Sequence, residues 1–248
     1  MHNAAFRALG VDAVYLAFDV PPERLRDAVL GARSLGIRQL AVSLPHKQAV
    51  MAHLDEVDPT ARRIGAVNTV TLRGERLVGS NTDWLGAVRA LERERKLSGA
   101  RAVVLGAGGA ACAAVFGLLE RGARVVVLNR TPERADALAA ALGAHGAGAL
   151  SDLRAGEYDV LVNTTSVGLR EDRSPVAADA LGSGTLVMDA VYEPEQTRLL
   201  RDAGARGAHT LSGKWWLVYQ AAEQLRLWTG CEPPIEAMAE AFDRAGRS

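Results

Sequence analysis

The sequence is poor in cysteine, has no long apolar run and carries no excess of charge of either sign. Its 248 residues include two cysteines, Cys112 and Cys231, which lie far apart, and five histidines without metal-ligand spacing. These residues predict neither a disulfide framework nor a metal site. No apolar segment reaches the length of a membrane-spanning helix, and the first residues have no signal-peptide pattern. We therefore expect no membrane partner and a cytoplasmic location.

The balance of charges argues against a partner that binds through a large excess of opposite charge. Lysine and arginine together number 29, and so do aspartate and glutamate. Nucleic acids and membrane surfaces attract proteins with a basic excess, which is absent here, so we expect no nucleic-acid partner. With 48% hydrophobic and 23% charged residues, the composition is ordinary for a soluble globular enzyme. The length accommodates one large or two modest domains.

A glycine-rich turn between an apolar strand and a small-residue helix points to a nucleotide. In the stretch GAGGAA (106–111), Gly106 permits a tight turn and Gly108 lets backbone approach a pyrophosphate. Ala111 allows the helix to pack closely on the strand, and the anion lies on the unpaired N–H groups of the helix N-terminus. The predicted cofactor-binding residues of this turn are Gly106, Ala107, Gly108, Gly109 and Ala110.

The next strand, 124–128, ends in Asn129, Arg130 and Thr131, which suit NADP better than NAD. These residues lie near the ~20-residue offset where an NAD site carries an acidic residue, and none of them is acidic. Thr131 and the proline after it read as the N-cap and first residue of a helix, which puts Arg134 at its third position. A cation there opposes the helix dipole, but is favourable if both arginines clamp a 2′-phosphate. The alternative is two solvated surface arginines.

The remaining pattern alternates strands with helices, which predicts an α/β fold with a parallel, doubly wound sheet in the second half. Strands are predicted at 14–20, 37–44, 159–163, 186–190 and 207–211, with a hairpin of 67–72 and 77–80. Helices are predicted at 1–9, 21–35, 59–64, 84–95, 112–121, 133–142, 195–203 and 235–244, and from about residues 48 and 214 onward. Residues 143–148 are predicted to be a loop.

Eight short strings in one order carry a resemblance to a known family. They are SLPHK (43–47), GAVNT (65–69), NTD (81–83), GAGGA (106–110), NRT (129–131), NTTSVG (163–168), DAVY (189–192) and GKWWLVYQ (213–220). Together they resemble shikimate dehydrogenase along essentially the whole chain. The resemblance implies NADP-dependent reduction of 3-dehydroshikimate to shikimate, a step of aromatic amino acid biosynthesis.

The resemblance also implies two α/β domains. A catalytic, substrate-binding domain is formed by both chain ends, 1–83 plus 214–248. A Rossmann-type NADP-binding domain lies between them in the sequence, at 84–213. The oligomeric state implied is a monomer or a homodimer.

The family's catalytic pair falls on Lys47 and Asp83. Hydride reduction of a ketone leaves an alkoxide that must receive a proton, so a general acid is needed, and a lysine beside a carboxylate can supply one. Read without the resemblance, Lys47 is a surface lysine at a helix start and Asp83 an N-cap.

Other matched positions concern substrate and cofactor. Asn68 and Gln220 match amides that bind substrate hydroxyls, since an amide offers both donors and an acceptor. Ser43 keeps the hydroxyl of a usual threonine, and Tyr192 matches a substrate-side tyrosine. The matched cofactor contacts are Thr164, Ala190 and Gly213, and the resemblance implies that the backbone at Gly213 approaches the nicotinamide.

Three departures bear on activity. The strand and Ser-x-Ser turn that the family places before the first helix, and that hold the substrate carboxylate, are absent from this sequence. We expect such a form to be less active and less stable than one extended upstream. Trp215 and Trp216 occupy positions where the family has a small residue and methionine; they either face the nicotinamide or belong to the core of the C-terminal helix. Ala41 and His46 replace residues usual near the lysine, and His46 reads as a bystander.

Alternative interpretations remain open from the sequence alone. A quinate or aminoshikimate dehydrogenase would share every matched residue. A catalytically weakened NADP-binding paralogue would explain the missing serines and the two tryptophans. A Rossmann protein of another reaction class would need only the glycine turn.

Overall fold

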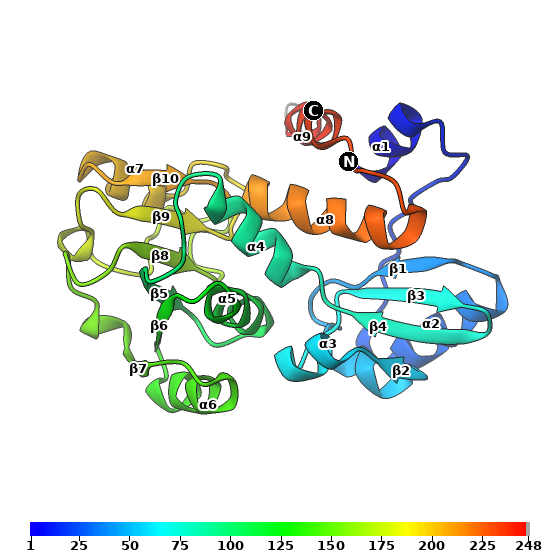
Figure 1. Cartoon of the computed structure of the whole chain (residues 1–248), viewed down its shortest axis with the longest axis horizontal. Helices are drawn as coiled ribbons and strands as arrows, with labels where there is room; N and C mark the ends of the chain where they lie inside the picture. The colour runs from blue at the N-terminus through cyan, green and yellow to red at the C-terminus, as the bar shows by residue number, and fades with distance from the viewer. Residues whose placement is uncertain (247–248) are drawn as a thin grey trace. The chain divides into compact units, whose positions relative to one another are not determined.

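The computed structural model describes residues 1–246 and divides into two compact units (Figure 1). The first unit contains Met1–Thr82 and Val218–Ser248, so both ends of the chain belong to it. The second unit is Asp83–Leu217. Asp83 and residues 214–217, which the sequence analysis assigned to the catalytic domain, thus fall in the second unit.

The second unit is built on a parallel sheet of six strands in the order β10-β9-β8-β5-β6-β7. The strands are β5 (Arg101–Leu105), β6 (Arg124–Asn129), β7 (Gly146–Ala149), β8 (Val160–Asn163), β9 (Leu186–Asp189) and β10 (His209–Leu211). Continuous apolar runs such as RVVVL suit strands buried on both faces. The α/β fold with a parallel sheet that the sequence predicted is confirmed.

Helices cover this sheet. They are α4 (Asp83–Glu92), α5 (Gly109–Glu120), α6 (Pro132–Leu142) and α7 (Arg198–Ala205), with short 3₁₀ turns η3 (Leu150–Asp152) and η4 (Ala178–Ala180). Helix α4 packs on α5, α6 lies along β6 and β7, and α7 lies against β9 and β10. A buried cluster that includes Leu105, Leu161 and Leu199 joins the strands to α7. The sheet is thereby a rigid base for the loops that follow its strands.

Strand β7 corrects the prediction of a loop at 143–148. Its sequence, Gly-Ala-Gly-Ala, has none of the β-branched or aromatic residues that mark a strand. It forms because β6 offers an unpaired edge, with which it pairs from Val126↔Gly146 to Asn129↔Ala149. Pairing with an existing edge therefore outweighs its low strand propensity.

The first unit has a smaller, mixed sheet of four strands in the order β1-β3-β4-β2. The strands are β1 (Gln39–Ala41), β2 (Glu56–Val57), β3 (Thr69–Arg73) and β4 (Arg76–Ser80). The helical elements are α1 (His2–Leu9), η1 (Pro22–Arg24), α2 (Leu25–Ser34), η2 (Ala49–His53), α3 (Pro59–Ile64), α9 (Ile235–Ala245) and the Val218–Thr229 part of α8 (Gly213–Thr229). The predicted hairpin is confirmed as β3 and β4, which turn at Gly74.

The strand predicted at 14–20 is not formed. Its residues belong to no sheet, and the side chains of Val14, Leu16 and Phe18 are exposed. The backbone N–H and C=O of Tyr15 pair instead with the side-chain amide of Asn3, at 2.7 and 2.9 Å. Residues 14–20 therefore have a high strand propensity but pair with no neighbouring strand. The strand predicted at 37–44 is also shorter, since only Gln39–Ala41 pairs with β3.

His2 is a buried titratable group that ties α1 to α8. Its Nε2 lies 3.3 Å from Oε1 of Gln224, and its ring is 4.5 Å from that of Tyr15. Burial lowers the pKa of His2 from 6.5 to about 4. The imidazole is consequently neutral in the folded protein at pH values where the unfolded chain already binds a proton.

We expect His2→Gln to make the protein less sensitive to acid. Between pH 6.5 and 4 the unfolded parent binds more protons than the folded parent, so its free energy of unfolding falls as the pH falls. The loss approaches about 3 kcal/mol across this window, at about 1.36 kcal/mol for each pKa unit. Urea unfolding of both proteins at several pH values measures it. If the free energy of unfolding falls equally with falling pH in the parent and the variant, His2 is not a buried, neutral group.

Candidate active site

The glycine turn predicted from the sequence lies between β5 and α5. Gly106 has a φ of 111°, and a Cβ there would lie 2.6 Å from Oγ1 of Thr164, so only glycine fits. Gly108 is the N-cap of α5, and a Cβ on Gly108 or Gly109 would meet no atom within 4 Å. The fully buried Ala111 lets α5 approach the sheet. The helix N-terminus therefore faces open space, as a phosphate site requires.

Two arginines stand at the end of β6, the next strand of the sheet. Thr131 is the N-cap of α6 and proline opens the helix, so Arg134 occupies the third position as predicted. The Nδ2 of Asn129 donates to the carbonyl of Thr131 at 2.9 Å and shapes this corner. Arg130 and Arg134 are exposed, and neither forms an ion pair with another residue in the described range, 1–246. Their charges are available to an anion.

The loops after β8 and β9 extend the same edge of the sheet. The N–H of Thr164 and its Oγ1 both donate to the carbonyl of Leu105, at 2.9 and 2.6 Å. The N–H of Ala190 donates to the carbonyl of Asn163 at 2.8 Å. Gly213 begins α8 beside this loop, because a Cβ there would lie 2.5 Å from the carbonyl oxygen of Ala190. The structure thus brings the three remaining predicted cofactor residues to the carboxyl edge of the sheet.

In the first unit the predicted substrate residues Asn68 and Gln220 meet. Nδ2 of Asn68 lies 3.3 Å from Oε1 of Gln220 and 3.0 Å from Oγ1 of Thr82. Oδ1 of Asn68 accepts from the backbone N–H of Thr82 at 2.8 Å, and Oγ1 of Thr82 donates to the carbonyl of Gln220 at 3.0 Å. These contacts fix both amides in a polar cluster that suits hydroxyl groups.

Thr82 and Gln224 were missed as members of this cluster. Nε2 of Gln224 donates to the carbonyl of Asn68 and to Oγ1 of Thr69, at 3.1 and 3.0 Å. Asn68 and Gln224 are far apart in sequence, and no local pattern marks that contact. For Thr82, its place in the string NTD next to Asp83 was the available signal.

The other predicted residues occupy several places. Lys47 is half-buried in the turn before η2, and its carbonyl accepts from the N–H of Val67 at 2.8 Å. Ser43 is exposed after β1 in the first unit, whereas Asp83 is buried at the start of α4 in the second unit. Tyr192 is exposed in the loop after β9, also in the second unit, so it is not a core residue.

Three residues that depart from the family pattern, Trp215, Trp216 and His46, each contact another part of their own unit. Nε1 of the buried Trp216 donates to the carbonyl of Asp83 at 2.8 Å, which favours a packing role. Trp215 stacks with the guanidinium of Arg93, whose Cζ is 3.7 Å from the ring centroid. Nε2 of His46 lies 2.7 Å from the carbonyl of Val20, which agrees with a bystander role in chemistry.

Within the described residues, no helix combines the length and the apolar character that a bilayer span requires. No group of three or more His, Cys, Asp or Glu side chains in residues 1–246 is placed to hold a metal ion. Cys112 and Cys231 are both free thiols.

The matches to known families and proteins span most of the chain. Three family models match: the shikimate dehydrogenase substrate binding domain at residues 1–70, shikimate / quinate 5-dehydrogenase at 88–170, and the shikimate 5′-dehydrogenase C-terminal domain at 217–241. A protein of Thermococcus kodakarensis named shikimate dehydrogenase (NADP(+)) is 52% identical over 94% of this chain and 86% of its own length.

Solved structures agree with these matches. Shikimate 5-dehydrogenase from Thermus thermophilus, in complex with NADP(H) and shikimate, is 43% identical and has a TM-score of 0.93, covering 98% of this chain and 92% of that one. Quinate dehydrogenase from Corynebacterium glutamicum in complex with NAD is 32% identical, with a TM-score of 0.86 over 97% of this chain and 92% of that one.

The close approach at Gly213 gives a test of the second unit. A Cβ would lie 2.5 Å from the oxygen and 2.8 Å from the carbonyl carbon of Ala190, both backbone atoms that do not move easily. We expect Gly213→Ala to lower the free energy of unfolding by about 1–3 kcal/mol. Gly204→Ala on α7 is the control, because its Cβ meets only a methyl group at 3.9 Å and alanine favours the helix. Equal unfolding midpoints for the two variants would show that the contact is not tight.

Proposed function

This chain belongs to the shikimate dehydrogenase family, and from that premise we propose that it catalyses the NADP-dependent reduction of 3-dehydroshikimate to shikimate. The observation that carries the proposal is the polar cluster of the first unit. Its two amides, Asn68 and Gln220, are those to which the resemblance assigns the substrate hydroxyls, and they are hydrogen-bonded together. Lys47 belongs to the same unit.

The chain's own residues have separate tasks in this reaction. Asn68 and Gln220 orient the substrate through its hydroxyl groups, with Ser43 and Tyr192 as further contacts. Lys47 donates a proton to the oxygen of the former ketone, since the alkoxide left by reduction must be neutralised. To Asp83 the resemblance assigns the role of the lysine's carboxylate partner in proton transfer. NADPH, when bound, supplies the hydride for the ketone carbon.

The second unit supplies the residues that fit NADP. The open N-terminus of α5 suits the pyrophosphate, and the guanidinium groups of Arg130 and Arg134 suit a 2′-phosphate. Neither arginine has an ion-pair partner within residues 1–246, so the anion does not have to displace a carboxylate. A cytoplasmic location and a monomeric or dimeric state remain predictions from the sequence.

A quinate dehydrogenase is the second candidate, because one matching model includes quinate and one similar structure is a quinate dehydrogenase with NAD. Initial rates with shikimate and with quinate, each with NADP⁺ and with NAD⁺, separate the two. We expect the highest kcat/KM for shikimate with NADP⁺. A preference for quinate with NAD⁺ would favour the second candidate. Cofactor binding without turnover of either substrate would indicate a binding protein.

Lys47→Ala tests the proton donor. General acid–base groups contribute about 10²–10⁴-fold, so kcat should fall by that order while KM for shikimate changes far less. Lys96→Ala, an exposed lysine in the second unit, is the control and should leave the rate unchanged. A Lys47→Ala protein with near-normal kcat would refute the assignment.

Arg130→Ala tests the 2′-phosphate clamp. Loss of a hydrogen bond to a charged group amounts to about 1.5–3 kcal/mol, so the Kd of NADPH should rise about 10- to 100-fold. The Kd of NADH, which lacks the phosphate, should barely change. Arg124→Ala is a matched control, because this exposed arginine begins the same strand at its other end. Equal losses with both cofactors would mean that the clamp is misassigned.

A further inference from the structure

Two buried polar side chains face each other at the carboxyl ends of neighbouring strands. Asn163 ends β8, Asp189 ends β9, and they are register partners in the parallel pair. Both side chains are fully buried. Nδ2 of Asn163 donates to Oδ1 of Asp189 at 2.9 Å. A buried carboxylate is unfavourable unless hydrogen bonds satisfy it, so the remaining partners of this pair matter.

Those partners come from three different segments. Oδ1 of Asn163 accepts from the N–H and Oγ1 of Thr165, at 3.0 and 2.8 Å, in the loop after β8. Oδ1 of Asp189 accepts from the N–H of Val191 at 3.0 Å, in the loop after β9. Oδ2 of Asp189 accepts from Oγ1 of Thr197 at 2.7 Å. The pair therefore fixes both loops and the start of α7 together.

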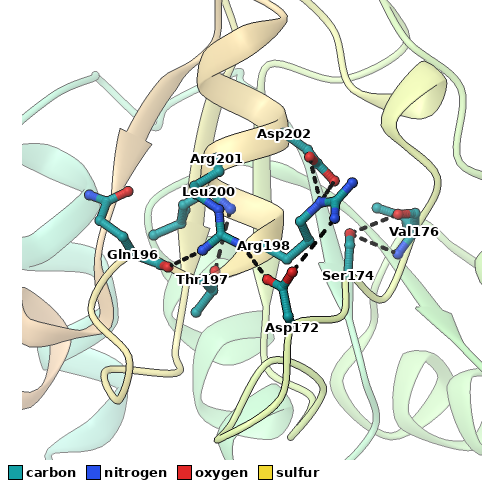
Figure 2. A network of polar contacts seen from close by, with 9 residues as sticks. All are labelled: Asp172, Ser174, Val176, Gln196, Thr197, Arg198, Leu200, Arg201 and Asp202. Carbon is teal, nitrogen blue, oxygen red and sulfur yellow. Dashed lines mark hydrogen bonds and ion pairs between the residues drawn. The ribbon is translucent and has the colours of Figure 1, made fainter.

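Helix α7 is held at its start from two sides. Thr197 is its N-cap, and its Oγ1 also accepts from the N–H of Leu200 at 3.3 Å (Figure 2). On the outer side, Arg198 and Arg201 both pair with Asp172, as Figure 2 shows. The contact from Thr197 to Asp189 is thus a buried polar anchor of the helix start, beside the apolar packing of Leu199 and Leu200.

The tied loops contain the predicted cofactor contacts. Thr164 precedes Thr165, and Ala190 lies between Asp189 and Val191. The carbonyl of Ala190 lies so close to Gly213 that a Cβ there would clash with it. The residue before Gly213, Ser212, is bonded to the loop after β9, since its Oγ donates to Oε1 of Glu195 at 3.0 Å. Asn163 and Asp189 thereby connect the segments that contain Thr164, Ala190 and Gly213.

We propose that Asp189 is a positioning residue for the nicotinamide end of the cofactor site, acting through the loops after β8 and β9. The inference rests on the proposed function only for the identity of the cofactor. Asp189 acts through other residues and touches no reacting atom itself. Its carboxylate sets where the loop backbone stands.

The electrostatics of the carboxyl group support a role other than stability. Burial raises the pKa of Asp189 to about 6, against opposing hydrogen bonds from Thr197, Val191 and Asn163. The folded protein thus binds the proton more readily than the unfolded chain, and the group's contribution to stability falls as the pH rises from about 4 to 6. Above pH 6 the ionised carboxylate therefore contributes less stability than its protonated form would, so stability alone does not account for an acidic residue here.

The same group makes cofactor binding depend on pH. The groups that bond the carboxyl are neutral, and the charged neighbours Glu195 and Arg198 are exposed and bonded to Ser212, Asp172 and Asp202. The carboxylate accepts from all three partners. Protonation makes one of its oxygens a donor, so the Thr197 hydroxyl, the one partner that can also accept, must reverse its bond or a bond is lost. We expect the affinity for NADPH to fall as the pH falls through 6.

The test compares two ligands and three variants at pH 5.5 to 8. The Kd values of NADPH and of adenosine 2′,5′-bisphosphate, which lacks the nicotinamide, are measured by titration. Asp189→Asn and Thr197→Val should raise the Kd of NADPH about tenfold at pH 8, the effect of one charge-assisted hydrogen bond. The Kd of the bisphosphate should stay at the parent value. Thr197→Ser, which keeps the hydroxyl, should restore parent behaviour.

The outcomes separate this inference from the proposed function. Asp189→Asn should also lose the pH dependence of NADPH binding near pH 6 that the parent shows. Parent-like NADPH binding by Asp189→Asn, or by Thr197→Val if the former fails to fold, would overturn the positioning role while leaving the dehydrogenase intact. Equal losses for both ligands would indicate general destabilisation and also overturn it. Failure of the parent to bind NADPH would instead overturn the proposed function.

Discussion

The second unit depends on one constraint, the parallel register of its strands. Because all six strands run in one direction, their carboxyl ends form a single edge, and each following loop begins there. The N–H of the residue after one strand donates to a carbonyl near the end of its neighbour: Gly106 to Leu128, Thr164 to Leu105 and Ala190 to Asn163, each at 2.8–2.9 Å. The loops are thereby fixed to the sheet and to one another.

In the first unit, polar side chains hold segments together that are far apart in the sequence. Beside its small mixed sheet, Asn68 is hydrogen-bonded to Thr82 and Gln220. Such a network is favourable only when every member is satisfied, which fixes the amides in one geometry. Such an arrangement suits hydroxyl groups, because each amide offers both donors and an acceptor. The two units thus present different chemistry: amide and hydroxyl groups in the first, and the N-terminus of α5 with two exposed arginines in the second.

The sequence predicted the features that depend on local order. The glycine turn, the N-cap of α6 with Arg134 at its third position, and the β3–β4 hairpin each follow from spacing within a few residues. The predictions from the sequence were wrong or incomplete where contacts between distant segments determine the structure. Strand β7 exists because β6 offers an edge, and residues 14–20 lack one. The partners of Asn68 and Asp189 lie on other elements, so no local pattern reveals them.

We propose that the cofactor binds at the carboxyl edge of the six-stranded sheet. Hydrogen–deuterium exchange with and without NADP⁺ tests it directly, because backbone amides that bind phosphate become protected. We expect slower exchange at residues 106–111, 129–134 and 163–168, with residues 69–80 of the first unit's hairpin unchanged. Unchanged exchange at all three segments, at a concentration where NADP⁺ saturates the protein, would contradict it.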